Sequence, residues 1–149
     1  KATKMLISTC KDNLKGVKGI TSRYRMTNKP APSSASDYVD TILNPLRAFL
    51  GRYESSLNNF FPRGVWDIEI IKEVNISFTL YLKSVIETVK NMDSTLQRRA
   101  RNTQKGGLSD SEKIMMQLKL DVKAYKTSIS ALNIDLGKVD NVSMLDVVE

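Results

Sequence analysis

The side chains that could carry chemistry in this sequence are one cysteine, a few carboxylate pairs and a group of lysines near the N-terminus. The sequence has no histidine, which removes Ser-His and Cys-His catalytic arrangements and every zinc site that uses histidine. The only cysteine, Cys10, cannot build a cysteine-rich metal site. Glycine pairs such as Gly106 and Gly107 match neither the dinucleotide fingerprint nor the P-loop. We therefore expect no cofactor and no metal site.

The carboxylate pairs are the remaining candidates for acid-base catalysis, and each has a simpler structural role. Glu69 and Glu73 have the spacing of one helix face, where exposed carboxylates are common. Asp110 and Glu112 stand where a helix is expected to begin, and acidic residues in a first turn complement the helix dipole. No cluster of ionisable groups indicates a pocket. We predict no catalytic residue and a protein that is not an enzyme.

The cysteine and the apolar stretches indicate the compartment. With one cysteine no internal disulfide can form, and a reducing cytosolic setting is the simplest. Cys10 lies in a helically spaced apolar stripe with Leu6 and Leu14. Inert core packing is favoured over a reactive thiol, because buried cysteine behaves as a small hydrophobe. The longest charge-free stretches, such as 74–82, are far shorter than the roughly 20 apolar residues that span a bilayer. Any membrane association must then be peripheral.

The lysines form the one basic surface that the sequence predicts. The net charge is +7, and residues 1–35 hold eight basic residues and one acidic residue, while the rest of the chain holds 15 of each. At helical spacing one side of the first segment collects Lys4, Lys11, Lys15 and Lys18. Such a strip could bind anionic lipid or nucleic acid. No nucleic acid partner is expected, because aromatic residues for base stacking are not interleaved with the lysines. A solvated lysine face is the plain alternative.

The first segment is expected to be helical. Apolar residues recur at steps of three and four and predict a basic helix over 1–29. Gly16 and Gly19 are unfavourable inside a helix and are expected to bend or fray it. Proline and serine then predict a loop over 30–35, since proline disfavours helix in itself and in the residue before it.

A second helix is expected over 36–61. Ser36 or Asp37 supplies its N-cap. Pro45 falls inside the helical pattern and lacks the N–H that a continuous helix needs, so we expect a kink or a short break there.

The segment 65–102 has two interpretations. Between Val74 and Leu82 apolar and polar residues alternate as in a strand. At helical spacing the same segment keeps one apolar stripe throughout, and strands usually stop at about 8 residues. We therefore predict one long helix. Ile76 and Leu80 lie outside its main stripe, one turn apart. Contacts of a central helix with two neighbours are the favoured explanation, and a docking strip for another protein is the alternative.

The next helix has clear start and stop signals. Ser109 and Glu112 have the spacing of a capping box, in which each side chain bonds to the backbone N–H of the other. An amphipathic pattern follows and predicts a helix over 109–136, with Gly137 as the stop. The apolar stripe of this helix covers barely three heptads, so packing within the chain is favoured over a coiled-coil dimer.

Three remaining features complete the organisation of the chain. A loop is expected over 103–108, and a short helix over 140–149 is expected to pack back on the body. Trp66 is large enough to anchor either the core or an interface, and the core is favoured. The chain begins at Lys1 rather than Met, which suggests a part of a longer protein with a single domain over 1–149.

The order of several short motifs carries a family resemblance. The motifs are Ser36-Asp37-Tyr38-Val39, Ile42-Leu43-Asn44-Pro45-Leu46, Gly64-Val65-Trp66, Val89-Lys90-Asn91-Met92-Asp93-Ser94-Thr95-Leu96, and Gly106-Gly107-Leu108-Ser109-Asp110 leading into Gln117-Leu118-Lys119-Leu120-Asp121-Val122. In this order they resemble the C-terminal domain of subunit 2 of the conserved oligomeric Golgi complex, a multisubunit vesicle-tethering complex.

The resemblance implies both a fold and a role. The implied fold is all-α, an antiparallel bundle or rod of four to six helices. The implied role is that of a non-enzymatic structural subunit acting in intra-Golgi retrograde transport and Golgi organisation. Implied partners are other subunits of the complex, small GTPases, SNAREs and coiled-coil tethers. The implied location is the cytosolic face of Golgi membranes, as a peripheral protein, and the cytoplasm.

Overall fold

The computed structural model describes residues 2–57, 63–99 and 107–149. Every regular element in these ranges is a helix, which confirms the all-α prediction. The α-helices are α1 (Ala2–Asn13), α2 (Gly19–Tyr24), α3 (Asp37–Ile42), α4 (Asn44–Leu57), α5 (Trp66–Arg99) and α6 (Asp110–Ala131). Short 3-10 helices are η1 (Leu14–Lys18), η3 (Leu136–Lys138) and η4 (Val142–Val148).

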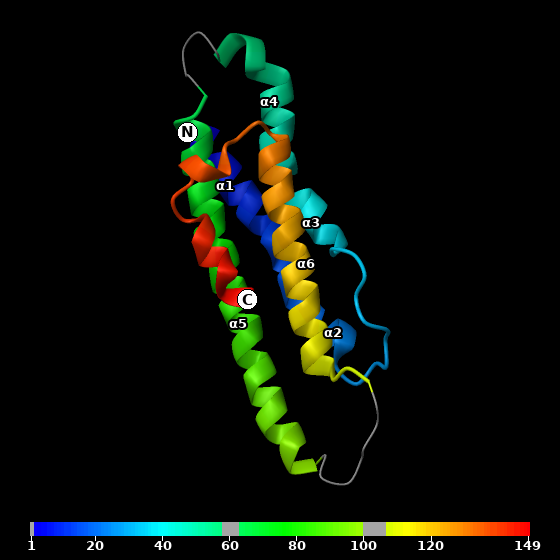
Figure 1. Cartoon of the computed structure of the whole chain (residues 1–149). Helices are drawn as coiled ribbons and strands as arrows, with labels where there is room; N and C mark the ends of the chain where they lie inside the picture. The colour runs from blue at the N-terminus through cyan, green and yellow to red at the C-terminus, as the bar shows by residue number, and fades with distance from the viewer. Residues whose placement is uncertain (1, 58–62, 100–106) are drawn as a thin grey trace.

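The longest helix, α5, is the element on which most of the others pack. Helix α6 runs beside it in the opposite direction, and η4 returns along α5 (Figure 1). Helix α1 contacts α3, α4 and α5. The core lies between these helices and includes the fully buried side chains Leu14, Ile42, Leu46, Ile71, Phe78, Leu82, Ile114, Leu118, Tyr125 and Ile129. The segment that alternates like a strand in sequence is therefore part of the central helix.

The first predicted helix is divided at the glycines and is shorter than expected. A 3-10 segment replaces α-helix at Gly16, where an added Cβ would lie only 2.5 Å from the Cβ of Tyr38. Glycine allows α3 to approach the chain closely there. The prediction of helix up to residue 29 is wrong, because α2 ends at Tyr24 and Met26 adopts a φ of 56°. Residue 1 lies outside the described residues.

The second predicted helix is broken next to its proline. Helix α3 ends before Leu43, and α4 begins at Asn44, so Pro45 occupies a first turn where no N–H is required. Ser36 takes the N-cap position, but its side chain makes no capping hydrogen bond. Its hydroxyl instead donates to Asp121. Residues 58–61, the predicted end of this helix, lie outside the described residues. The same holds for residues 100–102 of the predicted long helix and residues 103–106 of the predicted loop after it.

Helix α6 begins as predicted and ends earlier. Both hydrogen bonds of the capping box between Ser109 and Glu112 are present. The predicted stop at Gly137 is wrong, because the helix ends at Ala131 and Asn133 takes a left-handed φ of 60°. Asparagine tolerates that conformation and often terminates helices. The early end lets Ile134 and Val139 turn back into the core.

The C-terminal segment is helical but not α-helical. Residues Val142–Val148 form a 3-10 helix that buries Leu145 and Val148. Asn141 fixes its start, because its side chain donates to the carbonyl of Lys72 and accepts from Asn75 on α5. The predicted short helix over 140–149 thus lies against the central helix as a 3-10 segment.

Candidate interaction surface

The four lysines predicted as a basic strip are not all free cations. Lys11 lies 3.4 Å from the carboxylate of Glu73, and Lys15 lies 3.1 Å from that of Asp12. The ammonium of Lys18 stands 5.6 Å from the centre of the Tyr81 ring. Lys4 is exposed. The structure therefore divides the strip among separate local partners, and its binding of lipid or nucleic acid stays a prediction.

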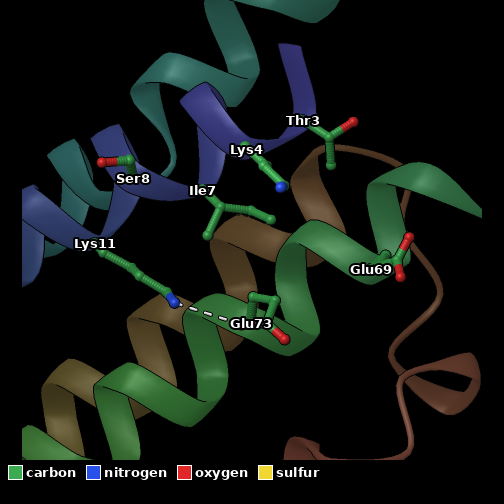
Figure 2. A pocket seen from close by; sticks show the side chains of 7 residues that line it. All are labelled: Thr3, Lys4, Ile7, Ser8, Lys11, Glu69 and Glu73. Atoms are coloured by element: carbon green, nitrogen blue, oxygen red, sulfur yellow. Dashed lines mark hydrogen bonds and ion pairs between the residues drawn. The ribbon is translucent and has the colours of Figure 1, made fainter. Parts of the chain in front are cut away.

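A shallow groove of about 710 Å³ runs between α1 and α5 at this surface. Its lining consists of Thr3, Lys4, Ile7, Ser8, Lys11, Glu69 and Glu73. Figure 2 shows Lys11 reaching from α1 toward Glu73 on α5, while Glu69 points away from both lysines. Two cations and two carboxylates leave the groove without a dominant charge. It does not gather the convergent groups that catalysis needs.

The side chains with shifted pKa values lie in the core instead of the groove. Burial raises the pKa of the Cys10 thiol to about 11, although a backbone hydrogen bond at Leu46 opposes the shift. Cys10 is fully buried, which confirms the prediction of inert core packing. Among the described residues no group of three or more His, Cys, Asp or Glu could hold a metal ion.

Ile76 and Leu80 are uncovered on the outer face of α5. Their exposed fractions are 39% and 63%. Helix α5 contacts α1, α6 and η4, in agreement with the favoured explanation of a central helix with several neighbours, and Ile76 and Leu80 still keep exposed surface. The docking strip stays a prediction. We call Ile76 and Leu80 the α5 strip. Charged side chains continue the strip at helical spacing on both sides, namely Glu69, Glu73, Lys83 and Glu87.

Trp66 lies at the edge of the core. It is partly buried, and its ring meets that of Phe49 edge-on at a centroid distance of 5.7 Å. The contact joins the start of α5 to α4. The predicted core role is thus the one that the geometry supports, since such ring pairs stabilise packing.

Sequence reasoning missed a buried polar network around Asp121 on α6. The Asp121 carboxylate has no exposed surface and accepts four hydrogen bonds of 2.7–2.9 Å, from Ser36 N, Ser36 Oγ, Tyr38 Oη and Gln117 Nε2. Burial, followed by the charge and hydrogen bond of Asp121, raises the pKa of Tyr38 above its usual range. The network fixes the chain before α3 onto α6.

A signal for this network does exist in the sequence. Asp110, Lys113, Gln117 and Asp121 recur at steps of three and four, which places them along one side of a helix. In the structure all four side chains form hydrogen bonds with the segment that joins α2 to α3. Asp110 accepts from Met26 N and Lys113 donates to Lys29 O. Gln117 donates to Ser34 O and Asp121 accepts from Ser36 N. Polar residues at helical spacing can therefore indicate a helix side that binds a loop of the same chain, and not only a helix side that faces solvent.

The structure defines the class of the protein as all-α. Its described part is a helical body with a packed core, and the exposed apolar pair Ile76 and Leu80 lies among charged side chains on its longest helix. No helix in the described ranges has both the length and the apolarity needed to cross a bilayer.

Comparison with known proteins gives the family. The model of the C-terminal domain of COG complex component COG2 matches residues 1–122, and the chain belongs to this family. Three similar relatives are each named conserved oligomeric Golgi complex subunit 2. The protein from Dictyostelium discoideum is 31% identical over 88% of this chain, that from Homo sapiens 30% over 94%, and that from Drosophila melanogaster 28% over 97%.

The chain spans only part of these relatives. It covers 15%, 20% and 22% of the length of the three proteins, in the same order. No solved structure shows a significant match.

Proposed function

We propose that this chain is a structural module of a Golgi vesicle-tethering subunit. In this proposal it acts without catalysis in intra-Golgi retrograde transport and Golgi organisation, at the cytosolic face of Golgi membranes. Its partners are other subunits of the conserved oligomeric Golgi complex, with small GTPases, SNAREs and coiled-coil tethers as further candidates. The observation that carries the proposal is the family match over residues 1–122.

The fold suits a mechanical role. Helix α5 has 34 residues, and at 1.5 Å per residue it is about 51 Å long. It packs against α1, α6 and η4, so the positions at these contacts keep fixed separations. A helix held in this way can present one partner at a defined distance from another, with no bond made or broken.

The α5 strip is the surface that we propose for docking. An exposed apolar pair at one-turn spacing, with charges before and after it, matches the pattern by which one helix packs along another. The apolar residues would supply the buried contact. Glu69, Glu87 and Lys83 are exposed and would set which partner fits, through pairing or repulsion of charges.

The test uses the full-length subunit in cells. We expect Ile76→Asp with Leu80→Asp to reduce co-purification of other Golgi complex subunits, because two carboxylates cannot be buried against an apolar partner. Val65→Asp is the matched control, since Val65 is 67% exposed just before α5 and lies outside the strip. It should leave recovery unchanged. Circular dichroism of each variant checks that the helices remain.

Two outcomes would contradict the proposal at different levels. Equal recovery of subunits with the strip variant and the control would remove the α5 strip as the docking surface. Failure of the unaltered full-length protein to recover any other subunit would contradict the tethering role itself.

A further inference from the structure

A tight turn after α2 displays the most exposed large apolar side chain of the described residues. Met26 is 86% exposed. It adopts a φ of 56°, and Asn28 two residues later adopts a φ of 53°. We call residues 25–29 the Met26 turn. Asparagine tolerates the left-handed conformation, whereas methionine rarely adopts it.

The turn is fixed by α6 and by its own side chains. The backbone N–H of Met26 donates to Asp110 at 2.9 Å. Lys113 donates to the carbonyl of Lys29 at 2.6 Å. The hydroxyl of Thr27 donates to the carbonyl of Arg23, also at 2.6 Å. Both ends and the apex are therefore held, and the methionine side chain is presented outward in one place.

Fold stability alone does not explain methionine at this position. Glycine adopts a positive φ without the steric cost that a Cβ brings. The Met26 side chain is almost completely exposed, so it gains little from burial within the chain. The contacts of the described residues therefore give the Met26 side chain no stabilising role within the chain.

The turn and the residue before α2 ends carry three cations, and one carboxylate, that of Asp37, lines a hollow with Arg23 and Lys29. Arg23, Arg25 and Lys29 are exposed, and none of them forms an ion pair within the described ranges. The nearest acid on α6, Asp110, directs a carboxylate oxygen at the backbone N–H of Met26. These free cations contrast with Lys11 and Lys15, whose charges are paired.

We propose that the Met26 turn contacts an anionic phospholipid surface, with Met26 entering the headgroup region and the three cations meeting lipid phosphates. A lone apolar side chain in an exposed turn does not build the broad complementary contact of a protein interface. It does suit a fluid interface, which closes around it, and cations beside it add attraction to anionic lipid. The contact is weak and accessory, and it goes beyond the proposed docking of other subunits.

The test measures binding of the full-length subunit to vesicles. One set contains phosphatidylcholine alone, and the other contains phosphatidylcholine mixed equally with phosphatidylserine. We expect binding to the anionic set only. Met26→Gly should weaken it about fivefold to tenfold, as expected for partial burial of one large apolar side chain. Met5→Ala is the matched control, because Met5 is also exposed, at 68%, and should leave binding unchanged.

Stability separates this effect from misfolding. Met26→Gly relieves the left-handed backbone, so its melting temperature should stay the same or rise by about 2–4 °C while vesicle binding falls. The charge test is Arg25→Gln with Lys29→Gln, expected to weaken binding at least about tenfold at low salt. Its control is Lys72→Gln with Lys126→Gln, which lie outside both the turn and the predicted lysine strip and whose charges are paired with Asp140 and Asp146.

Three results would overturn the proposal. One is vesicle binding by Met26→Gly equal to that of the unaltered protein. Another is equal binding to both vesicle sets. The third is a loss of other Golgi complex subunits with Met26→Gly while vesicle binding is retained, which would identify the turn as a protein contact. None of these results bears on the α5 strip, so failure here is distinguishable from failure of the proposed docking.

Discussion

The inner and outer faces of α5 differ sharply although their residues are similar in type. Phe78 on the inner face has no exposed surface and meets Tyr125 of α6 edge-on at 5.1 Å. Tyr125 in turn donates to Asn75 at 2.8 Å. Leu80, two residues after Phe78, is 63% exposed. Helical position, rather than hydrophobicity, therefore decides which apolar residues serve stability and which remain available to a partner.

The largest expected effect is on the inner face. Phe78→Ala should lower the free energy of unfolding by about 3–5 kcal/mol, because it removes a fully buried ring and leaves a cavity against Tyr125. Urea denaturation of the 149-residue chain measures it, with the milder Phe78→Leu as a second variant. A loss below about 1 kcal/mol would mean that the inner face collapses around the gap, and the contrast between the faces would fail.

The dependence of stability on pH tests whether water is excluded from the core next to the inner face of α5. Cys10 lies on α1, which packs on α5, and burial raises its pKa from 9.0 to about 11. The folded state thus holds the thiol proton more tightly than the unfolded state. This contribution to stability is fully present below pH 9 and is lost as the pH rises toward 11.

The expected loss from Cys10 is about 1 kcal/mol between roughly pH 8 and pH 10. Denaturation of the unaltered chain and of Cys10→Ala over that range isolates the thiol, since both proteins share the buried Tyr38 and Tyr125. The variant should lose less stability over this range. Parallel curves for the two proteins would show that water reaches the thiol.

The sequence predicts what depends on local periodicity. The stripe of α5 fixes its helical state despite the alternation near Val74, and Ser109 with Glu112 marks the start of α6. Pro45 correctly marks a break. In each case the physical cause lies within a few residues, so the amino-acid types alone are enough.

The sequence does not predict what depends on distant contacts. Asp121 is typical of an exposed helical position, and only the approach of Ser36 and Tyr38 makes it a buried acceptor. The stop at Asn133 replaces the glycine signal four residues later, because Ile134 is needed in the core. Met26 gives no local signal for a left-handed turn. It is held by Asp110, which lies 84 residues away in sequence.

For the candidate surface, the sequence places Ile76 and Leu80 off the main stripe, the structure leaves both with exposed surface, and docking at them stays a prediction. Their exposure depends on where α1, α6 and η4 happen to pack. For the lysine strip the difference between sequence and structure is the reverse. Its members share a helix side in sequence, and pairing with Glu73 and Asp12 then divides them.

The smallest expected effect completes the comparison of the two faces. Leu80→Ala should change the free energy of unfolding by no more than about 0.5 kcal/mol, because an exposed side chain loses little packing and alanine favours helix at least as well as leucine. The measurement is the same urea denaturation as for Phe78→Ala. A cost above about 1.5 kcal/mol would mean that part of the chain covers Leu80 in solution, and the strip would then belong to the core rather than to a partner. A negligible cost, together with loss of subunit recovery when Ile76 and Leu80 are replaced by aspartate, would separate the two faces: one residue position stabilises the fold, and another, two residues away, serves binding.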